Sequence, residues 1–152
     1  MLDQQLILIF SLIFIISLSY IDFRNHILPN KLVIAFLIYS LISIPAAKNF
    51  SFERFYFSIL YASLVFLIYL LIFIISKNSF GFGDVKYSFV MSIIPSYFFG
   101  FWPNLNIHIY AFLIAGIYAA FLIFVKKYKK NHVIAFGPFM SCSYFLFVVL
   151  SI

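Results

Sequence analysis

The sequence predicts an all-α membrane protein, a polytopic bundle of about six transmembrane helices with short loops and with both termini outside. Of its 152 residues, 66% are hydrophobic and only 9% are charged. A soluble globular domain is about half apolar and about a quarter charged, so this composition excludes that class. Disordered chains and disulfide scaffolds are excluded as well. We expect membrane lipid to surround the chain and expect no nucleic acid among its partners.

The uncharged stretches between the charged residues predict the helices in chain order. They cover residues 4–21, 32–47, 55–76, 87–125 and 131–152. A helix crosses the hydrocarbon core with about 20 residues, so four of these stretches predict one helix each, with 32–47 on the short side. The stretch 87–125 is long enough for two helices. Its break is predicted at 100–106, where Gly, Pro and Asn interrupt helices and a Trp favours the membrane interface.

The lysine and arginine residues predict the orientation, because they are enriched in cytoplasmic loops. With six helices, the segments 23–31, 77–86 and 126–132 share one side and carry eight of the ten basic residues. These three segments are therefore predicted to be cytoplasmic. We interpret the basic cluster in residues 126–130 as a topology anchor, with a lipid-binding or nucleic-acid-binding patch as the alternative.

The chain has only four acidic residues, and the predicted topology divides them into two pairs. Asp3 and Glu53 fall on the outer side, in terminal or loop positions where an acidic residue needs no explanation. Asp22 and Asp84 fall on the cytoplasmic side, at the inner end of the first helix and the inner start of the fourth. Ionisable groups at a membrane boundary are costly unless they are solvated or paired, which makes these two the candidate functional residues.

Each of these aspartates lies in a distinctive local sequence, and each also has a purely structural explanation. After Asp22, a short polar segment leads to Pro29, which cannot continue the first helix but fits the first turn of the second. Asp22 could equally do no more than end a membrane span. Before Asp84, Gly81 and Gly83 allow a backbone turn closed to other residues and the close approach of another segment. Asp84 could equally be the N-cap of the fourth helix.

Two neighbouring carboxyl groups cannot both ionise easily, so such a pair shares one proton. That arrangement suits the hydrolysis of a peptide bond by a bound water. One carboxylate takes the proton of the attacking water, and the other carboxyl group donates to the carbonyl oxygen and later to the leaving amine. This chemistry needs no metal and no cofactor, and we expect neither. The single cysteine and the three scattered histidines show no metal-ligand spacing.

At these residues the chain resembles the prepilin peptidases, the type IV leader peptidases of the GxGD class of membrane aspartyl proteases. The first motif of that family places an aspartate seven residues before a Pro-Asn pair and is matched by Asp22, Pro29 and Asn30. The second motif, Gly-x-Gly-Asp-x-Lys, is matched by Gly81, Gly83, Asp84 and Lys86. A third stretch at residues 135–139 is similar to the Phe-Gly-Pro sequence that opens the last span of the family, and it contains Gly137 and Pro138.

The resemblance implies a single transmembrane peptidase domain over residues 1–152, located in the cell membrane with its active site facing the cytoplasm. Longer members of the family carry a cytoplasmic insertion with paired cysteines and also N-methylate the new N-terminus. This chain resembles the short form without that insertion, so methyltransferase activity is not predicted. The oligomeric state is left open.

The resemblance also implies an activity, the removal of the basic leader from type IV prepilins or pilin-like precursors, which would be the protein partners. It identifies Asp22 and Asp84 as the catalytic pair and does not decide which is the base and which the acid. The remaining motif residues are candidates for substrate binding or for shaping the site: Gly81, Gly83, Lys86, Pro29, Asn30, Gly137 and Pro138. Lys86 could equally be a topology lysine, and the Gly-Pro pair could simply start the last helix.

Three other functions stay open. The first is a GxGD protease that cuts within the bilayer, which belongs to the same class of enzyme. Against it, the polar residues that follow Asp22 place this aspartate close to the membrane surface. A small transporter, in which the aspartates bind a cation or relay protons, belongs to another class. Neither an acidic residue near the bilayer midplane nor a visible repeat between the two halves supports it. A non-catalytic assembly factor of a pilus-like system is the third.

Overall fold

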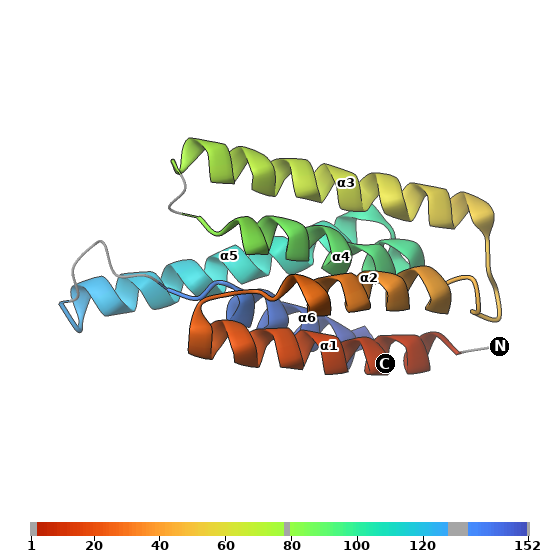
Figure 1. Cartoon of the computed structure of the whole chain (residues 1–152), viewed down its shortest axis with the longest axis horizontal. Helices are drawn as coiled ribbons and strands as arrows, with labels where there is room; N and C mark the ends of the chain where they lie inside the picture. The colour runs from red at the N-terminus through yellow and green to blue at the C-terminus, as the bar shows by residue number, and fades with distance from the viewer. Residues whose placement is uncertain (1–2, 78–79, 128–133, 152) are drawn as a thin grey trace.

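The computed structural model describes residues 3–77, 80–127 and 134–151, and in these residues the regular secondary structure consists of six α-helices (Figure 1). The helices are α1 (Gln4–Asn25), α2 (Asn30–Ser43), α3 (Phe52–Ile75), α4 (Phe82–Phe99), α5 (Phe101–Phe124) and α6 (Gly137–Ser151). The predicted all-helical class is confirmed, and so is the division of the stretch 87–125 into two helices. The predicted basic cluster in residues 126–130 lies largely outside the described residues.

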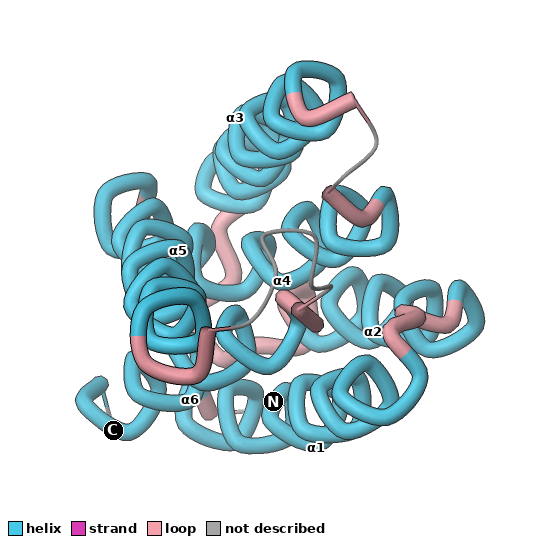
Figure 2. The backbone as a smooth tube through the Cα atoms, turned by 90° about the vertical axis from the view of Figure 1, so that its left-hand side faces the viewer, coloured by secondary structure: helices cyan, strands magenta, loops and turns pink. Residues whose placement is uncertain are grey.

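Successive helices run in alternating directions along one long axis (Figure 1). The end of α1 and the start of α4 therefore lie at one end of the bundle, and the starts of α1 and α3 lie at the other. α4 is the central helix: it packs against α1, α2, α3 and α5, while α6 lies between α1 and α5 (Figure 2). Twelve of its eighteen residues are buried, against four of the twenty-four in α3.

Three of the helices are long and apolar enough to cross a membrane. They are α1, α3 and α5, with mean hydropathies of 2.4, 2.7 and 2.2, and less than half of each is buried within the bundle. At about 1.5 Å per residue, the 14 residues of α2 and the 15 of α6 reach little more than about 20 Å. Among the described residues the structure thus supports three spans by length and composition. The six crossings and the outside termini stay predictions.

The break between α4 and α5 is shorter than predicted. Instead of residues 100–106, Gly100 alone separates the helices, with a φ of +83° that only glycine adopts readily. Trp102 and Pro103 already belong to the first turn of α5. Proline is tolerated in a first helical turn because the first N–H groups of a helix have no partner within the helix. Pro103 therefore lies inside α5 and does not extend the connection between α4 and α5.

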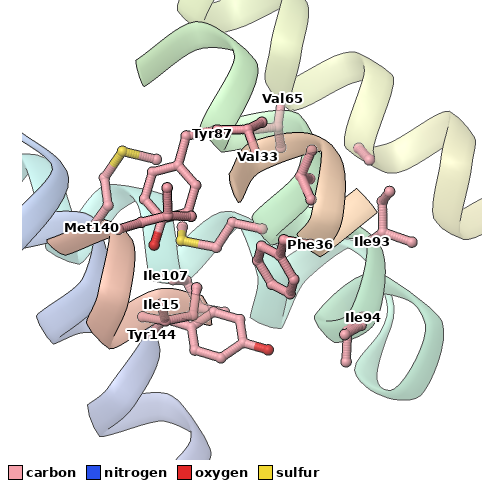
Figure 3. Close-up of a cluster of buried hydrophobic side chains, with 14 of the residues drawn as sticks. Ile15, Val33, Phe36, Val65, Tyr87, Ile93, Ile94, Ile107, Met140 and Tyr144 are labelled. Atoms are coloured by element: carbon pink, nitrogen blue, oxygen red, sulfur yellow. The ribbon is translucent and has the colours of Figure 1, made fainter. Parts of the chain in front are cut away.

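The bundle core combines apolar side chains with hydrogen bonds between helices. Figure 3 shows side chains from all six helices meeting around the centre, among them Ile15, Phe36, Val65, Tyr87, Ile107 and Tyr144. The Tyr144 hydroxyl lies 2.8 Å from the Ser11 hydroxyl, and the Tyr87 hydroxyl lies 3.1 Å from that of Ser141. Such bonds satisfy polar groups that lipid cannot solvate and hold helices in register.

Candidate active site

Asp22 lies in the last turn of α1, where the helix ends in a short elbow. His26 caps the helix in the left-handed conformation, with φ of 52°, and its N–H donates to the Asp22 carbonyl over 2.8 Å. The Asp22 side chain is only 5% exposed. Its Oδ2 accepts a 2.9 Å hydrogen bond from the backbone N–H of Gly137, the first residue of α6. The Gly-Pro motif at the start of α6 therefore contacts the first aspartate motif through this hydrogen bond.

Asp84 lies in the first turn of α4, and the prediction that it could be the N-cap of this helix is wrong. The N-cap is Gly81, and the backbone N–H of Asp84 donates to the Gly81 carbonyl over 3.1 Å. The carboxyl group is therefore not needed to cap the helix. It is 8% exposed, and its Oδ1 is buried without a hydrogen-bond partner among the described residues.

The two carboxyl groups share one pocket of about 440 Å³. The pocket lies between the α1–α2 elbow and the start of α4, and its lining includes Asp22 and Asp84 together with the motif residues around them. The two groups are close enough for their charges to interact. Residues that are 62 positions apart in the sequence therefore meet in a concave site at one end of the bundle, as the pairing of the two aspartates requires.

The motif glycines provide space around the carboxyl groups. A Cβ atom on Gly81 would lie 2.9 Å from Asp84 Oδ2, and one on Gly137 would lie 2.7 Å from Asp22 Oδ2. A Cβ atom on Gly83 would approach the Leu28 Cβ to 3.1 Å, where the elbow packs on α4. None of these glycines has a positive φ. The predicted close approach of another segment is found at Gly83, whereas the backbone turn that the glycines would allow is not adopted.

The remaining motif residues join the elbow to α4. Pro29 is the N-cap of α2 and Asn30 its first residue, so the proline precedes the first turn in which it was expected. The Lys86 ammonium donates to the Asn30 Oδ1 over 2.5 Å, and all three residues line the pocket. Pro138, by contrast, lines a neighbouring apolar pocket. The Lys86–Asn30 bond ties the two aspartate motifs together at the mouth of the site.

Several aromatic residues at the site were not found from the sequence. Tyr69 and Tyr87 are fully or almost fully buried, and both lie close enough to Asp84 to interact with its charge. The buried His108 is hydrogen-bonded through both ring nitrogens inside the bundle. No local pattern marks which of 34 Phe and Tyr side chains face the site, as 23 Phe and 11 Tyr occur along the whole chain.

The described residues hold no group of three His, Cys, Asp or Glu side chains that could together ligate a metal ion. The polar groups of the residues that line the pocket include the two carboxyl groups, the imidazole of His26, the ammonium of Lys86 and the amide of Asn30. A buried, mutually interacting pair of carboxyl groups is suited to general acid–base catalysis on a bound water. The fold and the site therefore define a helical membrane protein with a carboxyl pair at one end of its bundle.

The chain belongs to the Type IV leader peptidase family, whose model matches residues 9–124. The match includes both aspartate segments and ends before Gly137, which the structure nevertheless brings to Asp22. No curated protein and no solved structure matches the chain. The predicted resemblance is confirmed by the family match, and the protein is a peptidase of the leader peptidase type.

Proposed function

We propose that this protein is an aspartic endopeptidase that removes the leader of type IV prepilins or pilin-like precursors, with Asp22 and Asp84 as its catalytic pair. One observation carries the proposal: the two aspartates, far apart in sequence, line a single pocket and are close enough to interact. The glycines that touch them leave no room for any larger side chain at the same backbone positions. The family membership supports the leader peptidase chemistry.

In the proposed reaction, a water bound between the two carboxyl groups attacks the carbonyl carbon of the scissile peptide bond. The ionised carboxylate accepts the proton of that water while the protonated carboxyl group donates to the carbonyl oxygen. Collapse of the tetrahedral intermediate then breaks the C–N bond. The former base gives the proton that it took from the water to the leaving amine, and the former acid takes a proton back from a hydroxyl group of the intermediate, so the pair again holds one proton. The two carboxyl groups thus exchange roles between the two steps, and one acid does not donate twice. The shared pocket supports this reaction because both carboxyl groups line it and can act on the same bound molecule.

We propose that the site acts at the cytoplasmic face of the cell membrane. Among the described residues, most of the basic side chains lie at the pocket end of the bundle: Arg24, Lys31, Lys77, Lys86, Lys126 and Lys127. Lys48 and Arg54 lie at the opposite end (Figure 1). Basic residues are retained on the cytoplasmic side, so this distribution supports a cytoplasmic pocket. Its location at the helix ends favours cleavage at the membrane surface over cleavage within the bilayer.

The test is a reconstituted cleavage reaction with the purified chain in lipid vesicles. The substrate is a precursor with a short basic leader, a glycine at the cut and a following hydrophobic helix. We expect two products, with mass spectrometry placing the new N-terminus directly after the glycine. The double variant Asp22→Asn/Asp84→Asn is the matched control and should release nothing. A double variant that cleaves as well as the wild type would overturn the proposal, and an Asp-dependent ion flux without cleavage would favour a transporter.

A further inference from the structure

A groove lies between α1 and α6 on the surface of the bundle. This α1–α6 groove has a volume of about 450 Å³, and its lining includes Ile16, Ser19, Tyr20, Phe23, Cys142 and Phe145. The α1 residues lie three, four and seven positions from the first of them, and the two α6 residues lie three positions apart. Residues at these spacings share one face of a helix, so the groove is formed by two packed helix faces.

The α1–α6 groove combines small side chains with large, exposed ones. Ser19 and Cys142 are small, whereas Tyr20, Phe23 and Phe145 are 58%, 70% and 44% exposed. In a membrane, lipid tails are as apolar as leucine, so helices associate through close packing, and small residues let their backbones approach. A concave surface with small residues in its lining therefore suits a transmembrane helix as its occupant.

A second apolar pocket joins this groove to the pocket of the two carboxyl groups. The junction pocket, of about 460 Å³, shares Phe23 and Pro138 with the groove and shares His26 with the pocket of the carboxyl pair. Pro138 directly follows Gly137, whose N–H donates to Asp22 over 2.9 Å. Adjacent residues of α6 therefore contact a carboxyl group of the proposed catalytic pair and line the groove.

The groove extends from the pocket end of the bundle toward its middle. α1 ends and α6 begins at the pocket end, and the lining runs from Phe23 back to Ile16 on α1 and from Pro138 to Phe145 on α6. Each of these series rises by about 10 Å along its helix. Among the described residues that line the groove and the junction pocket, His26 is the one with a basic side chain, and none is acidic. An apolar segment thus finds no charged group along the groove itself.

The proposed substrate contains a segment that meets these conditions. The hydrophobic helix of a precursor follows directly after the cut. When the scissile bond lies between the two carboxyl groups, this helix must start at the pocket end and continue into the hydrocarbon core. The shared lining residues give it a continuous apolar path. This continuity favours the precursor over a second copy of the chain or bulk lipid, because neither of these has to start at the carboxyl pair.

We infer that the α1–α6 groove binds the first turns of the precursor's hydrophobic helix, which runs parallel to α6 from the pocket end. The inference rests on the function proposed above and adds to it a substrate-binding surface outside the carboxyl pocket. It also divides the Gly-Pro motif between two tasks. Gly137 holds Asp22 through its N–H, and Pro138 lines the path along which the substrate leaves the site.

Disulfide cross-linking through Cys142, the single cysteine of the chain, tests the inference without requiring cleavage. The inactive double variant Asp22→Asn/Asp84→Asn is reconstituted in lipid vesicles with precursors that carry one cysteine each, at successive positions of the hydrophobic helix. Cys142 lies five residues after Gly137, or about 8 Å along α6. We therefore expect cross-links at positions about one to two helical turns after the cut, recurring every three or four residues.

The matched control moves the cysteine to the opposite side of the bundle. Cys142→Ser/Leu71→Cys, in the same inactive background, places the thiol on α3, at a position that is 58% exposed and four residues from the end of the helix (Figure 2). This variant should show no preferred cross-linking position. Equal cross-linking of the two cysteines, or no cross-link to Cys142, would overturn the inference. A disulfide between two Cys142 residues that excludes the precursor would do the same and would assign the groove to a second copy.

Filling the groove gives a second test, by kinetics. Cys142→Trp should raise KM for the precursor while kcat changes little, since it removes binding that the ground state and the transition state share. Leu71→Trp is the control and should leave both constants at the wild-type values. Equal effects of the two substitutions, or a fall in kcat with KM unchanged, would overturn the groove. An intact cross-linking pattern in a chain whose wild type fails to cleave would instead contradict the proposed function alone.

Discussion

The two ends of the bundle each carry two acidic residues, which are exposed at one end and buried at the other. At one end Asp3 forms an exposed ion pair with Lys48, at 2.6 Å, with both side chains more than half exposed, and Glu53 lies exposed in the first turn of α3. At the other end Asp22 and Asp84 are buried in one pocket. The same chemical group thus lies in two different environments in one chain.

The difference in burial indicates which carboxyl groups of this fold are suited to acid–base chemistry. An exposed acid is solvated by water, so its ion pair with a nearby lysine contributes little to the free energy of unfolding. Two buried carboxyl groups within reach of one another cannot both be charged at low cost, so one retains a proton while the other remains a base. Only the buried end can therefore supply an acid and a base at the same time.

The largest expected effect comes from replacing the buried acids. Asp22→Asn and Asp84→Asn should each lower the rate of precursor cleavage by about a hundredfold to ten-thousandfold, because each removes one partner of general acid–base catalysis. Cleavage rates of purified, reconstituted variants give the measurement. Asp3→Asn and Glu53→Gln are the controls from the other end and should cleave at the wild-type rate. Wild-type cleavage by either buried variant would contradict the contrast between the two ends.

The next effect concerns the space that the glycines leave. Gly137→Ala places a Cβ atom 2.7 Å from an Asp22 oxygen and should lower cleavage by about tenfold to a hundredfold through displacement of the carboxyl group. The matched control is Gly116→Ala on α5, where nothing lies within 4 Å of the added atom. The Gly116→Ala variant should keep full activity. Its free energy of unfolding should rise by up to about 1 kcal/mol, because alanine favours the helix more than glycine does. Equal activity of the two variants would contradict a crowded Asp22.

A smaller effect is expected at the mouth of the pocket. Lys86→Met removes the donor of the hydrogen bond to Asn30 that joins the two aspartate motifs. Cleavage should fall by about threefold to tenfold, in line with the loss of one partly exposed, charge-assisted hydrogen bond. Lys86→Arg should restore part of the rate. A Lys86→Met variant with unchanged kinetics would leave the residue the role of a topology lysine.

The smallest effect is expected at the exposed pair. Lys48→Met breaks the ion pair with Asp3 and should change the free energy of unfolding by no more than about 1 kcal/mol. Thermal unfolding in detergent at low and high salt measures this change, which should shrink as salt is added. Cleavage should stay at the wild-type rate. A loss of activity here would show that the two ends are coupled and would weaken the comparison.

The sequence by itself determined the helical membrane class and the positions of the helices to within six residues, and it predicted the candidate pair. It could do so because an apolar chain leaves few ionisable residues, and because helix length and charge spacing are local properties. The predictions from the sequence were wrong where a local sequence rule allows two different structures. Asp84 fits an N-cap by composition, yet the cap is Gly81, and a proline in residues 100–106 fits both a loop and a first helical turn.

Only the tertiary structure decided how the pair is held. The hydrogen bond from the Gly137 N–H to Asp22 and the hydrogen bond between Tyr69 and His108 depend on contacts between different helices. The same is true of Asp84 Oδ1, which has no hydrogen-bond partner in the part of the chain that the structure describes. Such contacts are set by how six helices pack around α4, and periodicity along one helix contains no information about them. The sequence thus predicts which two acids act together, and the packing decides how their surroundings differ.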